Sequence, residues 1–483
     1  MTQHRLAMRL GLTFLIGCIY SVGLGNSNEW TWIGGSNSAN RAGVYGDKGV
    51  PDLANIPGAR REPVFWTDTN GDLWLFGGWG YSSLATFGYL NDLWKYSPSN
   101  GQWTWVHGSA AVNSTGVYGS QETSSSVTVP CARREAVSWI DNDGKFWLFG
   151  GQWSGPEAQS GGFLNDLWQY DPSLNRWACI NGNQLPNQSG VYGIQGVADT
   201  QNTPGARDGS VGWTDTSGNL WLFGGDGYDQ SGASDRLNDL WKFDVSCNKW
   251  TWVKGSNLVA SRGVYGEIGV ATSDAAPSSR DSPVGWTDID GCLWLFAGWG
   301  YGASGPASYM NDLWKYNPVT DQWTWVNGSN VTNQNGVYGI QGTLSPTNQP
   351  GARSGAGAWM DRHDRPYILG GYGAAASGFG GLNDLWRYEP SSNQWVWVNG
   401  SGSVNANNIY GILGAPSPTN TLGARSGSAV WIDSQNRLYL FGGWSYAQSD
   451  GNKRLNDLWK YTPVQDSGIN WDQVMQQEEA FSH

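Results

Sequence analysis

The segment Leu73-Trp-Leu-Phe-Gly-Gly78, followed by Asn91-Asp-Leu-Trp94, contains the unit from which most of this chain is built. An apolar run that ends in two glycines predicts a strand and a tight turn, and the second segment predicts a further strand. The tetrapeptide Asn-Asp-Leu-Trp recurs with separations of 72 to 74 residues. Its six copies begin at Asn91, Asn165, Asn238, Asn311, Asn383 and Asn456. So regular a period indicates a repeat architecture.

Each tetrapeptide lies between other recurring segments. Upstream of the glycines, a strand begins at an Arg and closes with an Asp-x-x-Gly turn, as in residues 207–218, and downstream lies an aromatic strand such as 323–326. Four short strands per unit make a small antiparallel sheet with two apolar faces. Stacking such sheets around an axis buries both faces. The sequence therefore predicts an all-β fold, a six-bladed β-propeller of four-stranded antiparallel blades.

The order of the repeated segments indicates how the ring closes. The first repeated element, Glu29-Trp-Thr-Trp32, matches the fourth, outer strand of the other units, and the last clear element, residues 456–461, matches a third strand. We therefore expect residues 30–33 to complete the blade built from residues 425–461, so that an N-terminal outer strand closes the propeller. The alternative partner, Ile469-Asn-Trp471, follows at a longer spacing than the other copies show.

The two ends of the chain differ in composition from the repeats. Residues 1–25 carry basic residues ahead of an apolar run, which predicts a cleavable secretory signal peptide. Within it, Leu15-Ile-Gly-Cys18 resembles a lipobox, and ordinary signal-peptidase cleavage is the alternative. We assign residues 26–463 to the propeller and 464–483 to a polar C-terminal tail. The protein is expected to be secreted, periplasmic or at the cell surface, lipid-anchored if Cys18 is modified, with no membrane span after signal cleavage.

Composition excludes several classes of partner and cofactor. The net charge of -12 repels phosphate backbones, so nucleic acid is not expected as a partner. His107, His363 and His483 occupy unrelated repeat positions, so neither a metal nor another cofactor is expected. After Cys18, an even number of cysteines leaves room for one or two disulfides. These cysteines are Cys131, Cys179, Cys247 and Cys292.

The pattern of Gly-Gly after an apolar strand, then Asn-Asp-Leu-Trp-x-Tyr, then a Trp, resembles the kelch repeat over residues 29–462. More narrowly, it resembles the long, Trp-rich variant of secreted bacterial proteins. Kelch units are usually shorter, and the excess here lies mainly in a connection in which Gly-Val-Tyr-Gly recurs, first at Gly43. The resemblance implies a propeller but no single function, because kelch propellers include protein-binding adaptors, a copper radical oxidase of galactose and a periplasmic sialic-acid mutarotase.

Charged residues at the start of the innermost strands form the first candidate site. Six repeat arginines should surround one mouth of the central channel: Arg60, Arg133, Arg207, Arg280, Arg353 and Arg425. They either bind an anion, as the mutarotase resemblance suggests, or pair with the repeat aspartates, and we favour the structural pairing. Those aspartates are Asp92, Asp166, Asp239, Asp312, Asp384 and Asp457. Nearby charges that do not repeat are stronger candidates for specificity or catalysis: Arg61, Glu62, Arg134, Glu135, Asp208 and Asp281.

Aromatic residues after the Gly-Gly pairs form the second candidate site. They are Trp79, Tyr81, Trp153, Tyr228, Trp299, Tyr301, Tyr372, Trp444 and Tyr446. In a four-stranded blade, the connections after the second and fourth strands emerge on one face, so these side chains should lie on a loop-rich face. Rigid aromatic side chains with polar edges suit stacking on sugars or anchoring a protein. The alternative is that they hold the long loops down as a local core.

These observations lead to two functional hypotheses. We favour an exported, non-catalytic recognition or scaffold protein, a monomer that binds a glycan or protein ligand through the loop-rich aromatic face. The alternative is a sugar-active enzyme, mutarotase-like or hydrolase-like, that uses the charged residues at the channel mouth. Neither a nucleophile elbow nor a phosphate loop is present in the sequence. An acid pair for glycoside chemistry would leave no local signature, because its members would come from different blades.

Overall fold

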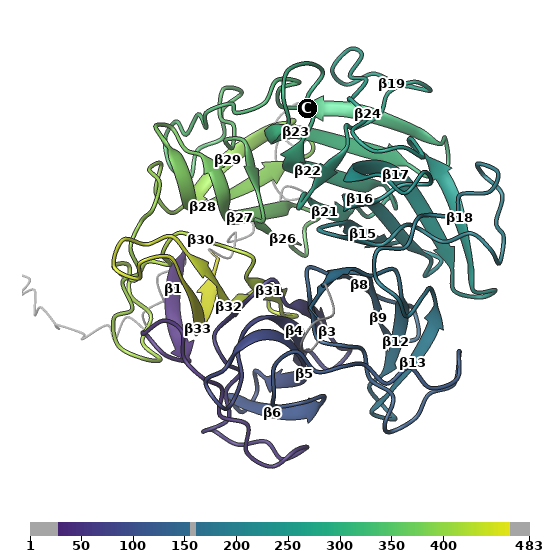
Figure 1. Ribbon diagram of the computed structural model, residues 1–483. Helices are drawn as coiled ribbons and strands as arrows, with labels where there is room; N and C mark the ends of the chain where they lie inside the picture. Colours follow the sequence, from purple (N-terminus) through teal and green to yellow (C-terminus); the bar gives the residue numbers. More distant parts are fainter. Residues whose placement is uncertain (1–27, 155–160, 464–483) are drawn as a thin grey trace, which may run out of the picture. The chain divides into compact units, whose positions relative to one another are not determined.

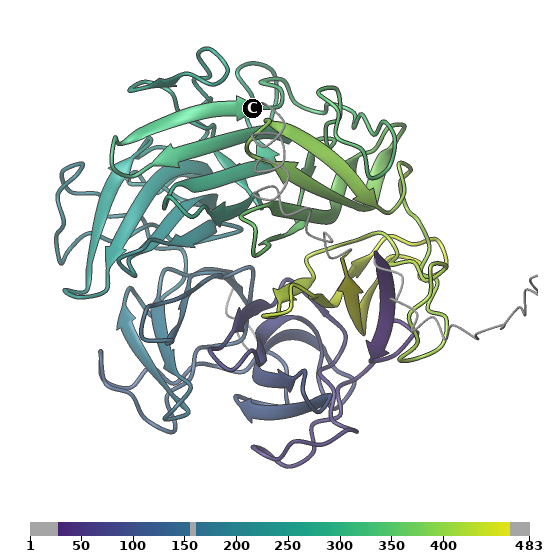
Figure 2. The ribbon, with the colours of Figure 1, turned by 180° about the vertical axis from the view of Figure 1, so that it is seen from behind.

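Alternating apolar strands and glycine-rich turns build six small antiparallel sheets around a central channel (Figure 1). The computed structural model describes residues 28–154 and 161–463. The innermost strands contact one another in a closed circuit, β3 to β8, β15, β21, β26, β31 and back to β3. Figure 2 shows the same ring from behind. The predicted all-β propeller is therefore confirmed, and the circuit of six innermost strands fits the predicted six blades.

The innermost strand of each blade is split into two pieces. The short pieces that begin at the repeat arginines are β2 (Arg60–Arg61), β7 (Arg133–Arg134), β14 (Arg207–Asp208), β20 (Arg280–Asp281), β25 (Arg353–Ser354) and β30 (Arg425–Ser426). The pieces that line the channel are β3 (Val64–Thr67), β8 (Val137–Ile140), β15 (Val211–Thr214), β21 (Val284–Thr287), β26 (Gly357–Met360) and β31 (Ala429–Ile432).

Three further strands complete each blade. The second strands are β4 (Leu73–Tyr81), β9 (Phe146–Phe149) with β10 (Gln152–Trp153), β16 (Leu220–Tyr228), β22 (Leu293–Gly300), β27 (Pro366–Ala374) and β32 (Leu438–Ser445). The third are β5 (Phe87–Ser97), β11 (Gly162–Phe163) with β12 (Leu167–Asp171), β17 (Ser234–Asp244), β23 (Ser308–Asn317), β28 (Phe379–Glu389) and β33 (Lys453–Thr462). The outer strands are β6 (Gln102–His107), β13 (Arg176–Asn181), β18 (Lys249–Lys254), β24 (Gln322–Asn327), β29 (Gln394–Asn399) and β1 (Glu29–Gly34), and the short β19 (Ala271–Thr272) pairs with β24.

The N-terminal strand closes the sixth blade, as the order of the repeats predicted. β1 pairs antiparallel with β33, and Trp30 lies opposite Tyr461. The Trp30 ring lies 4.9 Å from that of Tyr461 and 6.3 Å from that of Trp459, and Trp30 is 4% exposed. The rival segment 469–471, the predicted signal peptide and the predicted C-terminal tail lie outside the described residues.

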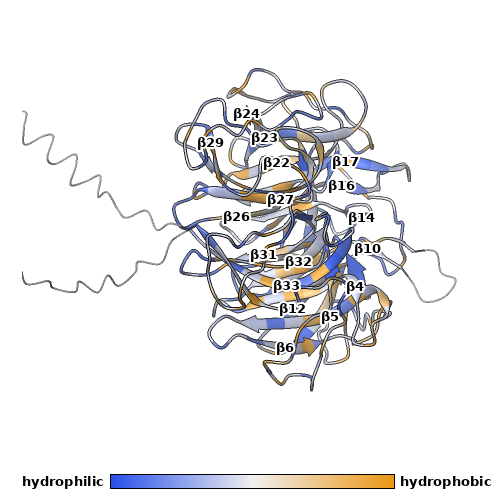
Figure 3. Cartoon of the chain, turned by 90° about the vertical axis from the view of Figure 1, so that its left-hand side faces the viewer, coloured by the Kyte–Doolittle hydropathy of each residue, from blue (hydrophilic) through white to orange (hydrophobic). Residues whose placement is uncertain are grey.

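Aromatic side chains fill the space between neighbouring blades. A Phe of one second strand repeatedly meets the Trp of the next outer strand, as in Phe76 with Trp177 at 5.3 Å between ring centroids and Phe223 with Trp323 at 5.6 Å. Figure 3 shows apolar colour along the strands and hydrophilic colour on β17 and at one end of β33. The high Trp content of the sequence is thus used mainly to join blades.

A buried polar framework supports the same strands in every blade. In the fourth blade, Arg280 donates two hydrogen bonds to Asp312, each 2.7 Å long, and a third to the carbonyl of Ala297. Tyr265 and Trp314 donate to the same Asp312 carboxylate. Equivalent Arg–Asp pairs occur in all six blades, and each of these arginines is at most 2% exposed. We call these Arg, Asp, Tyr and Trp residues the framework.

Blade packing requires the first glycine of the Gly-Gly pair within the second strand. Gly77 has φ of 65°, and a Cβ there would lie 2.8 Å from the carbonyl oxygen of Arg133 in the next blade. The corresponding glycine, Gly442, meets Arg60 across the closure in the same way. The second strand of one blade therefore lies so close to the strand that begins at the repeat Arg in the next blade that this position is nearly always glycine.

The cysteines are not joined. Cys131, Cys179 and Cys292 are buried and free, and Cys247 is exposed and free. The one or two disulfides for which the sequence leaves room are therefore not formed among these four cysteines, and the packing of the blades does not depend on them. Within the parts of the chain that the structure describes, no helix has the length and apolar character needed to cross a bilayer.

Candidate functional site

The loop face is the face on which the connections after the second and fourth strands emerge. At this face, one residue from each of the first three strands stands side by side across every blade. From the first blade to the sixth, these rows are Arg61–Trp79–Tyr89, Arg134–Gln152–Phe163, Asp208–Asp226–Arg236, Asp281–Trp299–Tyr309, Ser354–Tyr372–Gly381 and Ser426–Trp444–Arg454. The framework below repeats in every blade, whereas these rows do not.

A collar of backbone hydrogen bonds surrounds the channel just inside the rows. Its six residues are Glu62, Glu135, Gly209, Ser282, Gly355 and Gly427. Each donates its backbone N–H to the carbonyl of the collar residue in the preceding blade, over 2.7 to 3.1 Å, and the cycle is complete. All six have φ between 48° and 62°, the left-handed region. The collar therefore fixes the direction in which its side chains leave the backbone.

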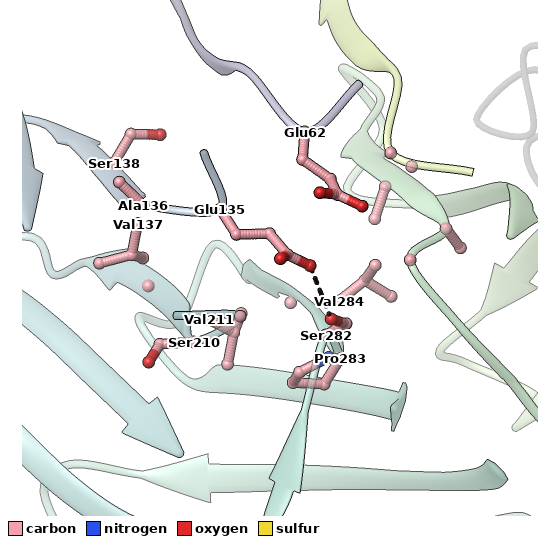
Figure 4. A pocket seen from close by; sticks show the side chains of 18 of the residues that line it. Glu62, Glu135, Ala136, Val137, Ser138, Ser210, Val211, Ser282, Pro283 and Val284 are labelled. Carbon is pink, nitrogen blue, oxygen red and sulfur yellow. Dashed lines mark hydrogen bonds between the residues drawn. The ribbon is translucent and has the colours of Figure 1, made fainter. Parts of the chain in front are cut away.

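Glu62 and Glu135 occupy collar positions where three other blades have glycine. A side chain in the left-handed region costs about 1 kcal/mol relative to glycine, so the fold itself favours glycine there. Figure 4 shows both glutamates directed into the cavity that the collar surrounds, with Glu135 joined to Ser282. Their retention against this backbone preference points to a function for the side chains.

Two connected cavities occupy the mouth. The outer one, of about 410 Å³, lies between Arg61, Glu62 and Glu135 on one side and Tyr309, Tyr372 and Tyr446 on the other. The inner one, of about 330 Å³, is lined by the collar and the first residues of the channel strands (Figure 4). They share several collar residues, so the two cavities adjoin each other at the collar.

Positive side chains gather on the sixth, first and second blades. Arg134 pairs with both Glu62 and Glu135, and Arg61 pairs with Glu62 at 3.1 Å. Arg61 lies over the ring of Trp79 at 4.7 Å, and Arg454 lies over the same ring at 4.3 Å. We call this group, Arg61, Arg134 and Arg454 with Trp79 and Trp444, the cationic sector.

Carboxylates gather on the third and fourth blades. Arg236 pairs with Asp281 at 3.1 Å, Asp235 at 3.3 Å and Asp226 at 3.6 Å. Burial raises the pKa of Asp281 to about 6, with Arg236 opposing the shift, and burial beside Glu135 raises the pKa of Asp208 well above its ordinary value. Burial, reinforced by Glu62, also raises the pKa of Glu135 to about 7. We call Asp208, Asp226, Asp235 and Asp281 the acidic sector.

The aromatic residues predicted for the loop face occupy three kinds of place. Tyr372 and Tyr446, with ring centroids 4.9 Å apart, line the outer cavity together with Tyr309, which the sequence analysis missed. Trp79, Trp299 and Trp444 lie under arginine side chains. Tyr81, Tyr228 and Tyr301 are half-buried. The structure therefore places some of these rings at the surface of the mouth and others in packing contacts, and their role in binding stays a prediction.

Trp153 departs from this arrangement. It follows Gly-Gly one residue later than Trp79 does, and Gln152 takes the row position instead. Its side chain is 9% exposed and packs with Cys131 and Leu164. Since a one-residue offset turns a strand side chain to the other face, Trp153 belongs to the core and not to the candidate binding surface.

The six repeat arginines begin the innermost strands, but they do not line the channel mouth with open charge. Each guanidinium is buried against its framework Asp. The aspartate also accepts from the Tyr of the Gly-Val-Tyr-Gly segment, as Asp92 does from Tyr45. Sequence reasoning missed that role, although the sixfold recurrence of this Tyr beside six aspartates was a signal for it.

The third-strand residues of the rows were also missed. They stand two positions before the repeat Asn and include four residue types, with Tyr and Arg each occurring twice: Tyr89, Phe163, Arg236, Tyr309, Gly381 and Arg454.

Among residues 28–154 and 161–463, no group of three His, Cys, Asp or Glu side chains is arranged to hold a metal ion. In the Asp141 turn, the carboxylate accepts from backbone N–H groups and Trp147, as a hairpin turn requires.

The closed ring of six blades with this framework defines a β-propeller whose loop face carries the variable residues. The family model of the KLHDC2/KLHL20/DRC7 Kelch-repeats domain matches residues 127–330 and, in a second match, residues 194–408. The chain therefore belongs to the kelch-repeat family. Kelch repeats generally mediate recognition of other proteins. No curated protein matches the chain.

Proposed function

We propose that this propeller is an exported, non-catalytic recognition protein that binds a protein or glycan ligand over the mouth of its channel on the loop face. The contact surface consists of the six rows, the collar glutamates and the tyrosines of the outer cavity. The kelch family supports a protein ligand first, and the half-buried aromatic rings also suit a glycan.

One contrast supports the proposal most directly. Framework positions hold the same residue types in all six blades, whereas the adjacent row positions hold arginine, aspartate, serine, tryptophan, tyrosine, glutamine, phenylalanine and glycine. The framework supports every row through the same strands, so the fold does not require this variety. Side chains that vary around a shared cavity are what recognition of an asymmetric ligand requires.

Selection of ligands followed by substitution tests the proposal. The full chain would be immobilised and screened against a displayed random-peptide library and a glycan array. A Tyr309→Ala/Tyr372→Ala variant should weaken the selected ligands at least about tenfold. Ile289→Ala is the matched control, because Ile289 is 83% exposed on the opposite face, in the turn after β21. Equal loss in both variants, or ligands indifferent to both, would refute binding at the mouth.

A sugar-active enzyme remains the second candidate because of one observation. Glu135 has a pKa raised to about 7 and lies beside Glu62, with both carboxylates paired to Arg134. A carboxyl group that is protonated near neutral pH can act as a general acid. Under this hypothesis, Glu135→Gln abolishes turnover of a sialic acid or related sugar, while Ile289→Ala on the opposite face preserves it. Turnover that is absent from the wild-type chain across a panel of glycosides and free sugars would exclude the enzyme.

Export is proposed from the sequence of residues 1–25. Mass spectrometry of the mature protein from a secreting host tests it. A chain that begins near residue 26 supports ordinary cleavage, a diacylglyceryl mass on Cys18 supports a lipid anchor, and an intact N-terminus in the cytoplasm would contradict export.

A further inference from the structure

Two arginines occupy the same position in different blades and have opposite surroundings. Arg236 on β17 and Arg454 on β33 both stand two residues before the repeat Asn, at the third place of their rows. Arg236 has three carboxylates within ion-pair distance, from 3.1 to 3.6 Å. Within residues 28–154 and 161–463, no ion pair or side-chain hydrogen bond of Arg454 is found, and its Nε is buried without a partner.

The sequence explains this difference position by position. Around Arg236, the carboxylates come from the preceding residue, from the second strand of the same blade and from the row of the next blade: Asp235, Asp226 and Asp281. At the corresponding three places around Arg454 stand Lys453, Trp444 and Arg61. All three acids are therefore replaced, two of them by cations.

Aromatic rings occupy the space that the carboxylates leave. The Arg454 guanidinium lies 4.2 Å from the ring centre of Phe87, 4.3 Å from that of Trp79 and 4.6 Å from that of Trp444. The residue is 8% exposed. Rings at these distances stabilise the guanidinium by cation–π contact, and a guanidinium donates its hydrogen bonds in its own plane. Burial and the like charge of Arg61 lower the pKa of Arg454 to about 10, so it is still charged at neutral pH.

A buried guanidinium without an anion is costly, and aromatic contacts offset only part of that cost. The nearest carboxylate partner of Arg61, Glu62, is already shared with Arg134. Arg61 also lines the outer cavity, so the group lies at the edge of the proposed recognition surface. The protein supplies anions to Arg236 and not to Arg454, although the two positions are equivalent in the fold.

We propose that Arg454, with Arg61 beside it, forms an oxyanion subsite between the sixth and first blades, and that the ligand of the loop face carries a carboxylate, sulfate or phosphate group that binds there. The guanidinium edge of Arg454 would donate paired hydrogen bonds to two oxygens of the group. The flanking rings exclude water from the pair. The claim that the loop-face ligand carries this group rests on the proposed function. The claim that a small anion binds at Arg454 is independent of it.

Small anions test the subsite directly. Thermal unfolding and tryptophan fluorescence would be followed during titration of the full chain with inorganic sulfate, inorganic phosphate and glucuronate, at constant ionic strength set with chloride. We expect saturable binding of at least one anion. Binding should change the tryptophan fluorescence, because Trp79 and Trp444 contact the guanidinium. Comparison of the three anions separates ester-type from carboxylate ligands. Arg454→Gln should weaken binding at least about tenfold.

Two further variants keep the test decisive. Lys453→Asp copies the third blade by supplying an internal carboxylate, so it should abolish anion binding and raise the melting temperature without added anion. Arg176→Gln removes an exposed arginine at the start of β13, on the face opposite the loop face, so it should leave anion binding unchanged. Equal responses of the wild type, Arg454→Gln and Lys453→Asp would mean a general salt effect and would overturn the subsite.

The same variants separate this inference from the proposed function. If ligands selected on the loop face lose affinity in Arg454→Gln and compete with the anion, both proposals stand. If the selected ligands bind Arg454→Gln as well as the wild type, the loop-face function stands and the role of the subsite in it is refuted. If small anions bind but no ligand depends on Tyr309 or Tyr372, recognition at the mouth fails while the subsite stands.

Discussion

Asp312 and Asp281 belong to the same blade, yet they belong to different parts of the molecule. Asp312 is fully buried and accepts hydrogen bonds from Arg280, Tyr265 and Trp314, an arrangement that every blade repeats. Asp281 lies half-buried at the mouth, pairs with Arg236, and has Arg61, Arg134, Asp208, Ser354 and Ser426 as its counterparts. The comparison shows that positions with the same residue in every blade stabilise the ring, and that positions that differ between blades form the surface of its mouth.

The largest effect on stability is expected when the strand that closes the ring is removed. Deletion of residues 26–36 should lower the free energy of unfolding by on the order of 5 kcal/mol, because burial of Trp30 and the backbone pairing of β1 with β33 are both lost. Calorimetry on the deleted and full chains measures it. An unchanged melting temperature would show that another segment closes the sixth blade.

Substitution of the two aspartates tests the comparison itself. Asp312→Ala should cost about 3–5 kcal/mol, because it leaves the Arg280 guanidinium buried without its anion. Asp281→Ala should change stability by less than about 1 kcal/mol, because the pair with Arg236 is partly exposed. Denaturant unfolding of both variants decides the matter. Similar losses would erase the distinction between framework and mouth.

The pH dependence of stability isolates the cost of the mouth carboxylates. The pKa of Glu135 is about 7 in the folded protein, above its ordinary value, so the native state holds this proton more tightly than the unfolded chain does. Wild-type stability should therefore rise as pH falls from about 8 to about 5.

The matched variants for this experiment are Glu135→Gln and Glu267→Gln. Because Glu135→Gln removes the titrating group, its advantage over the wild type should be largest near pH 8 and should shrink as pH falls through 7. Glu267 is exposed in a loop, so Glu267→Gln should follow the wild type. Parallel curves for the wild type and Glu135→Gln would contradict the raised pKa.

The smallest effect is expected in the collar. Ser282 has φ of 48° at a position where three blades have glycine, so Ser282→Gly relieves backbone strain but adds freedom to the unfolded chain. The two contributions should leave stability within about 0.5 kcal/mol of the wild type. A loss above 1 kcal/mol, measured by denaturant midpoint, would show that the contact between Ser282 and Glu135 supports the ring.

The sequence sufficed for the blade number, the strand order and the closing strand, because six copies at an even period leave one consistent way to arrange them. For the site, the sequence predicted only part of the arrangement. It correctly placed the non-repeated charges next to the repeat arginines at the mouth, since the framework places every row in the same way.

The remaining features depend on geometry that spacing does not carry. Trp153 is one residue out of register, and only strand pairing reveals that it faces the core. The contacts of Arg454 with Phe87 and Trp79 cross the point where the chain closes on itself, so they join residues more than half the chain apart. The collar involves backbone groups, which leave no mark in the choice of residue except at its glycines.

The collar also has a consequence for how such a protein can change. Each collar N–H donates to a collar carbonyl, so anything that enters the mouth meets side chains and no free collar N–H. The cycle is complete with glutamate, serine and glycine among its members. Successive substitutions could therefore give the mouth a new specificity while the scaffold beneath stays the same, which makes this ring a natural starting point for engineering new binding proteins.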